Sequence, residues 1–233
     1  MSSKYKFSIA ALILEVAIIV LYGGLTKYHE AASADNENEE EAQKQTNFFY
    51  PILQDINVMI IIGFGFLMVF LHKHSFSSVS FTFFISALAV QMYILWCCLW
   101  ESVIKEHYEK IDVSYFEIIC GLYCAGAILI SYGALLGKIT AFQFLILASI
   151  EVAVYTLNEV LLYDGIFATD IGGSIAIHLF GSCFGIAASI MISKRNKADK
   201  SDDFESTKSS DTWALIGTIF LWLFWPSFNA SPS

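Results

Sequence analysis

Long apolar stretches recur along the chain and are separated by short polar segments. A helix that crosses a bilayer needs about 20 mostly apolar residues. Seven stretches approach or meet that length, the second and seventh being short. They are predicted at residues 7–25, 56–71, 79–100, 113–136, 139–162, 171–192 and 213–228. The pattern therefore predicts an all-α polytopic membrane protein, with residues 1–233 forming one unit.

The composition supports a lipid environment and narrows the class of protein. The chain is 56% hydrophobic and only 15% charged, whereas soluble domains carry about 25% charged residues. Its net charge of −9 comes without a basic cluster, which argues against nucleic acid as a partner because phosphate contacts require grouped lysines and arginines. No nucleophile–base pair, metal motif or phosphate loop is visible, so we expect neither an enzyme nor a cofactor.

The five cysteines all lie in apolar stretches. Their odd number is not that of a disulfide framework, and a structural metal site would need four soft ligands brought together. Packing as small apolar residues is the favoured interpretation. The residues are Cys97, Cys98, Cys120, Cys124 and Cys183.

The distribution of positive charge predicts the orientation in the membrane. With the N-terminus inside, only four of the 13 lysines and arginines lie outside, as the positive-inside rule favours. Residues 26–47 then form an acidic extracellular loop, expected to be solvated and disordered, and residues 193–210 form a cytoplasmic linker. The first stretch is too long for a signal-peptide core, so we interpret it as a retained helix.

Several acidic side chains fall within or beside the apolar stretches, where a charge is costly and marks a candidate functional site. A hydrogen bond to another helix is the simplest interpretation for Glu15, Glu117 and Glu151, and an interfacial cap for Asp55. Asp170 precedes Ile-Gly-Gly and is suited to capping a helix start. For Glu159 two roles stay open: an outer vestibule that attracts cations, or contact with lipid headgroups.

His178 is the principal candidate for transport chemistry. Helical spacing places Ser174, His178, Gly181 and Ser182 on one small, polar face that a neighbouring helix can approach closely. A neutral imidazole offers one donor and one acceptor nitrogen and titrates near neutral pH, so it suits a narrow pore for a weak base. A plain helix–helix hydrogen bond is an equally good interpretation.

Several motifs, in the same order, resemble the Rh-type branch of the ammonium transporter family. They are YPILQDINVMI at 50–60, GFGFLM at 63–68, GALLGK at 133–138, NE at 158–159, DIGGSIAIHLFG at 170–181 and ALIGTIFLWLFWPSFN at 214–229. The resemblance implies a helical bundle holding an extra first helix, the first repeat of an inverted pair and the opening helix of the second repeat. It also implies a homotrimer with a pore in each protomer, and expects the chain to be incomplete.

The resemblance also assigns roles to individual residues. His178 matches the first of two pore histidines, and Phe228 and Tyr123 match the stacked aromatic residues that close the outer pore. Asp170 matches an acidic residue near the ammonium path, and Glu159 matches a vestibule acid of the Rh type. The implied partners are ammonium or ammonia and membrane lipid, with CO2 as a further candidate, in the plasma membrane.

Two functional hypotheses follow. The first is a Rh-type ammonium/ammonia transporter with a histidine-lined hydrophobic pore. The second is a truncated, non-transporting paralogue that serves as a membrane scaffold or partner subunit. Retention of His178 favours the first, and the early end of the chain favours the second.

Overall fold

A computed structural model describes residues 3–32, 39–105, 110–193 and 205–231. Within these residues, seven helical spans are long and apolar enough to cross a membrane. They are Tyr5–Leu25, Glu39–Phe70, Phe76–Ile104, Tyr115–Leu135, Ala141–Gly165, Ile171–Ile192 and Lys208–Ala230. The predicted all-helical membrane fold is therefore confirmed, and each span covers most of the stretch predicted from hydropathy.

The regular elements divide these spans into α-helices and shorter segments of other helix types. The α-helices are α1 (Ser3–Leu25), α2 (Glu39–Val58), α3 (Gly65–Leu67), α4 (Ser75–Lys105), α5 (Tyr115–Leu135), α6 (Ala141–Val160), α7 (Phe180–Ser193) and α8 (Lys208–Ala230). The π-helical segments are η2 (Met59–Phe64), η4 (Leu161–Gly165) and η6 (Ser174–Leu179), and the 3-10 segments are η1 (Glu30–Ala32), η3 (Met68–Phe70) and η5 (Ile171–Gly173). The two strands are β1 (Thr26–Tyr28) and β2 (Ile111–Val113).

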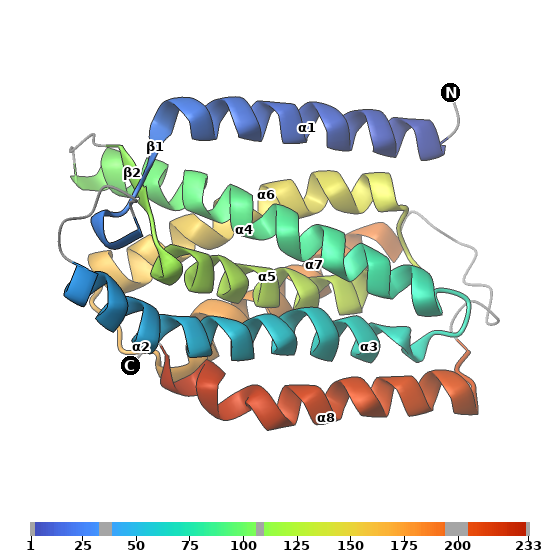
Figure 1. The fold of residues 1–233 in the computed structure, drawn as a ribbon. Coiled ribbons are helices and arrows are strands. Elements are labelled where there is room, and N and C mark those ends of the chain that lie inside the picture. Colours follow the sequence, from blue (N-terminus) through green and yellow to red (C-terminus); the bar gives the residue numbers. More distant parts are fainter. Residues whose placement is uncertain (1–2, 33–38, 106–109, 194–204, 232–233) are drawn as a thin grey trace.

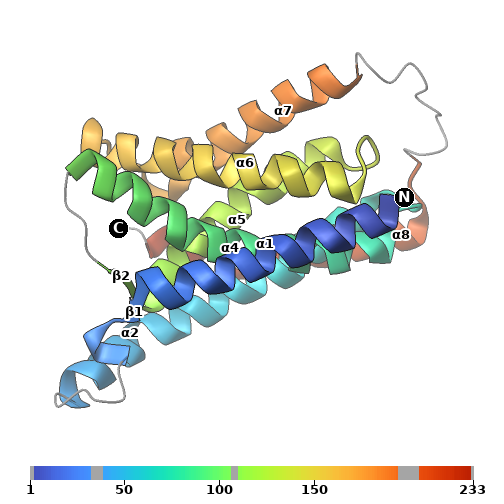
Figure 2. The same cartoon turned by 90° about the horizontal axis from the view of Figure 1, so that it is seen from above.

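The long helices lie side by side, with α1 and α8 at opposite edges of the bundle in Figure 1 and α4, α5 and α6 between them. Figure 2 shows the same bundle from above, where α7 diverges from its neighbours toward its C-terminal end. Helix α5 is the most enclosed, since 72% of its central residues are buried against 6% for α1. The core is therefore organised around α5, and α1 presents most of its surface to the surroundings.

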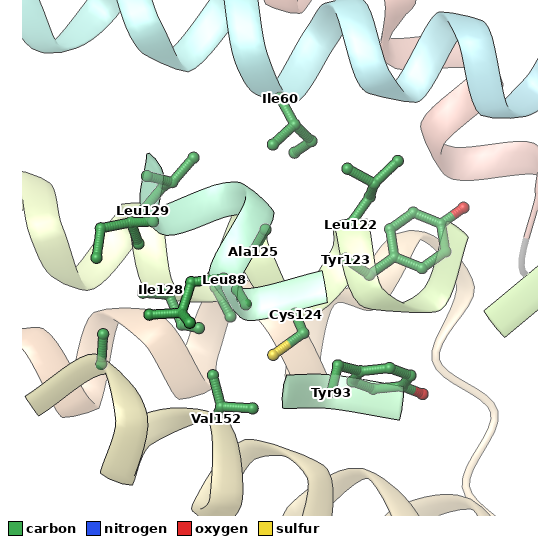
Figure 3. Packing of buried hydrophobic residues seen from close by; sticks show 14 of the residues in the cluster. Ile60, Leu88, Tyr93, Leu122, Tyr123, Cys124, Ala125, Ile128, Leu129 and Val152 are labelled. Carbon is green, nitrogen blue, oxygen red and sulfur yellow. The ribbon is translucent and has the colours of Figure 1, made fainter. Parts of the chain in front are cut away.

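Apolar side chains from several helices meet on α5. In Figure 3, Cys124 and Ile128 of α5 lie between Ile60 of η2 on one side and Val152 of α6 on the other. All four side chains are almost completely buried. Because lipid tails are as apolar as these side chains, close packing rather than exclusion of water is what holds such helices together.

Two of the acidic residues form contacts that differ from those expected. Glu117 is the N3 member of a capping box at the start of α5, where its carboxylate accepts a hydrogen bond of 2.8 Å from the backbone N–H of Ser114. The expected bond from Glu117 to another helix was therefore wrong. Asp55 lies one turn before the end of α2 and accepts a 2.6 Å bond from the hydroxyl of Ser227 on α8, so it joins two helices instead of capping one.

The acidic segment 26–47 is more ordered than predicted. Thr26–Tyr28 pairs in parallel with Ile111–Val113, and Lys27 forms a 3.2 Å ion pair with the facing Asp112. Helix α2 already begins at Glu39, because acidic residues in a first turn complement the helix dipole. The expectation of a disordered loop was wrong for these parts, and residues 33–38 lie outside the described residues. Most of the predicted linker, residues 194–204, also lies outside the described residues.

Helix α8 packs closely on the second span at Gly217. A β-carbon there would lie 2.3 Å from the backbone nitrogen of Leu67 and 2.6 Å from the carbonyl oxygen of Gly63. We expect Gly217→Ala to lower the free energy of unfolding by about 1–3 kcal/mol, since the two backbones must separate. Thermal unfolding in detergent measures the loss. Gly24→Ala is the matched control, because nothing lies within 4 Å of its β-carbon, and an equal effect of both changes would contradict the prediction.

Candidate functional site

A glycine pair bends the chain where the sixth span begins. Gly172 and Gly173 have φ values of 74° and 67°, which residues with a side chain adopt only at a cost. The bend turns the carboxylate of Asp170 back onto the helix start, where it accepts bonds from the backbone N–H groups of Ile175 at 3.0 Å and Ala176 at 2.8 Å. Asp170 is buried, and its carboxylate accepts from N–H groups that the helix start leaves without intrahelical partners.

His178 lies in the π-helical segment η6, directly after this bend. Wider helical turns of this kind are frequent at functional sites. The imidazole ring is stacked on the indole of Trp225 at a centroid distance of 5.5 Å and lies 6.1 Å from the ring of Phe228. Its Nε2 is buried and has no hydrogen-bond partner among the described residues. The ring thus faces α8, and its Nε2 forms no hydrogen bond with the described residues.

The predicted aromatic pair meets beside this histidine. The rings of Tyr123 on α5 and Phe228 on α8 touch edge to face with centroids 4.9 Å apart, and the Tyr123 hydroxyl donates a 3.3 Å bond to the carbonyl oxygen of Phe228. Both side chains are buried. The aromatic pair and His178 therefore form one continuous group, although they come from three separate parts of the chain.

A cavity of about 710 Å³ opens on the other side of Tyr123. Its lining includes the side chains of Glu159 and Asp170, so the structure brings four of the five predicted site residues to one region: Tyr123, Glu159 and Asp170 at the cavity and Phe228 against Tyr123. The fifth, His178, does not line the cavity and lies beyond Phe228. By contact, the cavity adjoins Tyr123, Tyr123 adjoins Phe228, and Phe228 adjoins His178.

Glu159 is held inside the bundle and does not extend to its surface. It lies one residue before the end of α6, is only 8% exposed, and accepts a 3.2 Å bond from the hydroxyl of Tyr155. Glu159 thus lies in the wall of the cavity, and its role as a vestibule acid stays a prediction.

The small, polar face predicted around His178 forms only in part. Gly181 is buried against α5, where a β-carbon would lie 2.6 Å from the carbonyl oxygen of Ala127, whereas Ser174 and Ser182 are exposed. The π-helical turns change the angular spacing of side chains, and α-helical spacing therefore misplaced the serines.

Two contributors to the site were missed from the sequence. Trp225 stacks on His178, and Tyr93 of α4 lines the cavity with Glu159. Trp225 lies three residues before Phe228, a helical neighbour, so that spacing was an available signal. Nothing local marks Tyr93, because the bundle contains many aromatic residues that serve only in packing.

The cysteines are all free, and within the described ranges no group of three or more histidine, cysteine or acidic side chains is arranged to hold a metal ion. Cys124 is buried in the core, as expected of a small apolar residue, and Cys183 is exposed. Cys97 and Cys120 line the cavity with Glu159.

A buried polar contact fixes the helix that carries His178. The hydroxyl of Ser131 on α5 lies within hydrogen-bond distance of the Glu151 carboxyl on α6 and 2.9 Å from the carbonyl oxygen of Gly181 on α7. Glu151 thus makes the interhelical contact expected of it, while for Glu15 such a contact stays a prediction.

These features define an all-helical membrane protein with an acidic cavity that leads to an aromatic pair and a histidine. The sequence profile of the Ammonium Transporter Family matches residues 17–233 of the chain. The chain therefore belongs to the ammonium transporter family. Its match covers the complete site described above.

The similar proteins are of the Rh type, which confirms the resemblance found in the sequence. Ammonium transporter Rh type B of Danio rerio is 39% identical over 98% of this chain and 50% of its own length. Ammonium transporter Rh type A of Mus musculus is 38% identical over 98% of this chain and 54% of its own. The solved structure of Nitrosomonas europaea Rh50, described as one of the Rhesus protein family of channels, matches with a TM-score of 0.70 and 34% identity over 80% of this chain and 49% of that one. The chain spans about half the length of these relatives.

Removing the Asp170 carboxylate tests how the helix start is held. Asp170→Ala leaves the N–H groups of Ile175 and Ala176 without their acceptor, and we expect a loss of about 1–3 kcal/mol in the free energy of unfolding. Asp170→Asn keeps one acceptor oxygen and is expected to recover part of the loss. Thermal unfolding of the purified protein measures both. Asp211→Ala, an exposed acid in the first turn of α8, is the control, and an equal loss there would contradict the assignment.

Proposed function

We propose that the protein conducts ammonium or ammonia across a membrane, and that His178 lines its path. The observation that carries this proposal is the buried, unpaired Nε2 of His178 beneath the Tyr123–Phe228 pair. A buried polar atom without a partner is costly. A small hydrogen-bonding solute that visits the site offsets that cost, and ammonia is such a solute.

The order of groups supports a stepwise passage. Glu159 and Asp170 line the cavity, and the Asp170 carboxylate, which backbone N–H groups hold in place, favours the arrival of a cation. The aromatic pair then excludes water, and a bare cation crosses such a region at high cost. Neutral NH3 crosses at lower cost, and His178 offers it a hydrogen bond. NH3 alone, ammonium, or NH3 with a separately moved proton each satisfies this scheme, and CO2 is a second candidate solute for the same apolar path.

The cellular setting is part of the proposal. We place the N-terminus in the cytoplasm because only four of the 13 lysines and arginines then lie outside, and we place the protein in the plasma membrane as a homotrimer by analogy with Rh-type relatives. The exposed apolar surface of α1 supports direct contact with lipid.

Replacing the histidine tests the path. In yeast that lack ammonium uptake, we expect the full-length protein to restore uptake and His178→Ala to lower its initial rate about 100-fold, the lower end of what a positioned proton-exchanging group contributes. His29→Ala, a histidine in the segment after β1, is the matched control and is expected to leave uptake unchanged.

The outcomes separate the two hypotheses. Equal uptake by the wild type and His178→Ala would remove His178 from transport. Normal membrane assembly with no uptake even by the wild type would favour a non-transporting partner subunit.

The aromatic pair is tested by two substitutions of Tyr123, one that removes only the hydroxyl and one that removes the ring. Tyr123→Phe keeps the edge-to-face contact with Phe228 and loses the hydroxyl that bonds to the Phe228 carbonyl oxygen, so we expect uptake to stay within about tenfold, the upper range for one neutral hydrogen bond. Tyr123→Ala opens the constriction and is expected to raise leakage of K⁺ relative to ammonium. Flux measurements in proteoliposomes test both, with the exposed Tyr5→Ala as control. Unchanged selectivity in Tyr123→Ala would remove this pair as the barrier.

A further inference from the structure

The contact between Ser131, Glu151 and Gly181 connects three helices, and the proposed transport path does not use it. The Ser131 and Glu151 side chains are fully buried, with exposed fractions of 0%. The Ser131 oxygen lies within hydrogen-bond distance of Glu151 Oε1 and 2.9 Å from the carbonyl oxygen of Gly181. The Ser131 hydroxyl oxygen therefore lies between two other oxygen atoms, one of Glu151 and one of Gly181. Whether both contacts are hydrogen bonds depends on which oxygen atoms carry a hydrogen.

Counting hydrogens shows which arrangement closes both contacts. A serine hydroxyl has one hydrogen to donate, and a backbone carbonyl has none. If Glu151 were ionised, the single Ser131 hydrogen would serve only one of the two contacts, and the other would bring two oxygen atoms together with no hydrogen between them. If Glu151 carries a proton on Oε1, that proton is donated to Ser131, and Ser131 donates its own to Gly181. Only the protonated acid satisfies both contacts.

The surroundings of Glu151 favour the same state. Within the part of the chain that the structure describes, Glu151 forms no ion pair. Its Oε2 is buried without a hydrogen-bond partner among those residues. An ionised carboxylate buried in that way would face a large desolvation penalty, with one hydrogen bond from the Ser131 hydroxyl to offset it. In a protonated acid the same atom is an uncharged carbonyl oxygen, whose burial costs far less.

We propose that Glu151 is a neutral carboxylic acid that donates a hydrogen bond to Ser131, so that a Glu151–Ser131–Gly181 chain fixes the helix bearing His178. Glu151 is thus a positioning residue that does not touch the transported solute. No proton is passed on in this role, since each hydrogen stays on its own oxygen.

The packing around the chain explains why this position matters. A β-carbon on Gly181 would lie 2.6 Å from the carbonyl oxygen of Ala127, and one on Gly185 would lie 2.8 Å from the α-carbon of Ser131. Helix α7 therefore lies directly against α5 at these glycines. His178 precedes Gly181 by three residues, close to one helical turn, so a shift of α7 on α5 moves its ring relative to α8.

Infrared spectroscopy tests the protonation state without any measurement of transport. The purified full-length protein is expected to show the carbonyl stretch of a protonated carboxyl group at neutral pH, and Glu151→Gln is expected to remove the part of that band that Glu151 contributes. Glu117→Gln is the matched control, because Glu117 accepts hydrogen bonds at a helix start, and it is expected to leave the band in place. A band unaffected by Glu151→Gln, or a carboxylate signal assigned to Glu151, would overturn the proposal.

The positioning role rests on the proposed function and is tested by uptake. Glutamine keeps a donor for Ser131 and carries no charge, whereas methionine has a similar length and no donor. We expect Glu151→Gln to retain uptake within about twofold and Glu151→Met to lower it about tenfold, the factor that one interhelical hydrogen bond in a membrane represents. Both variants are compared at equal membrane abundance.

The readouts distinguish the failures. If the wild-type protein shows no uptake but the infrared band behaves as expected, the proposed function fails and the protonated Glu151 stands. If uptake is lost equally in Glu151→Gln and Glu151→Met at normal abundance, the ionised acid is required and the positioning chain is wrong.

Discussion

The direct contact of α7 with α5 is the constraint on which the site depends. Gly181 and Gly185 lack side chains where the two backbones meet, so the spacing of the helices is set by backbone atoms and leaves no freedom for adjustment. From that fixed contact the chain runs back through η6 to His178. The imidazole reaches Trp225 and Phe228 because α8 is itself held close to the second span at Gly217. Two glycine contacts thus decide how the histidine and the aromatic pair meet.

Polar groups inside the bundle follow a common rule, because lipid offers them no hydrogen bonds. Asp170 satisfies the helix start after the Gly172–Gly173 bend, Asp55 accepts from Ser227, and Glu159 accepts from Tyr155. His178 is one of five residues with a buried side-chain polar atom that has no partner among the described residues, and its ring stands against Phe228 of the aromatic pair. In the proposed function, a visiting solute completes the hydrogen bonding of His178.

The sequence was a good guide to the spans and a poorer one to their ends and mutual contacts. Hydropathy located the second span but began it at residue 56, because a test for apolar length ignores the polar helical turns from Glu39 onward. The family motifs placed Tyr123 and Phe228 together, whereas the stacking of Trp225 on His178 depends on how far two distant helices approach. The π-helical turn at η6 has no simple residue pattern, so the exposure of Ser174 and Ser182 was not foreseen.

The parallel pairing of β1 with β2 sets an order for assembly during synthesis. Thr26–Tyr28 leaves the ribosome early, but its partner Ile111–Val113 follows only after α2, α3 and α4 have been made. Until then α1 has neither its strand partner nor the ion pair from Lys27 to Asp112. The strand pairing and ion pair at the C-terminal end of α1 therefore form only after α4, on which α1 also packs, has been made.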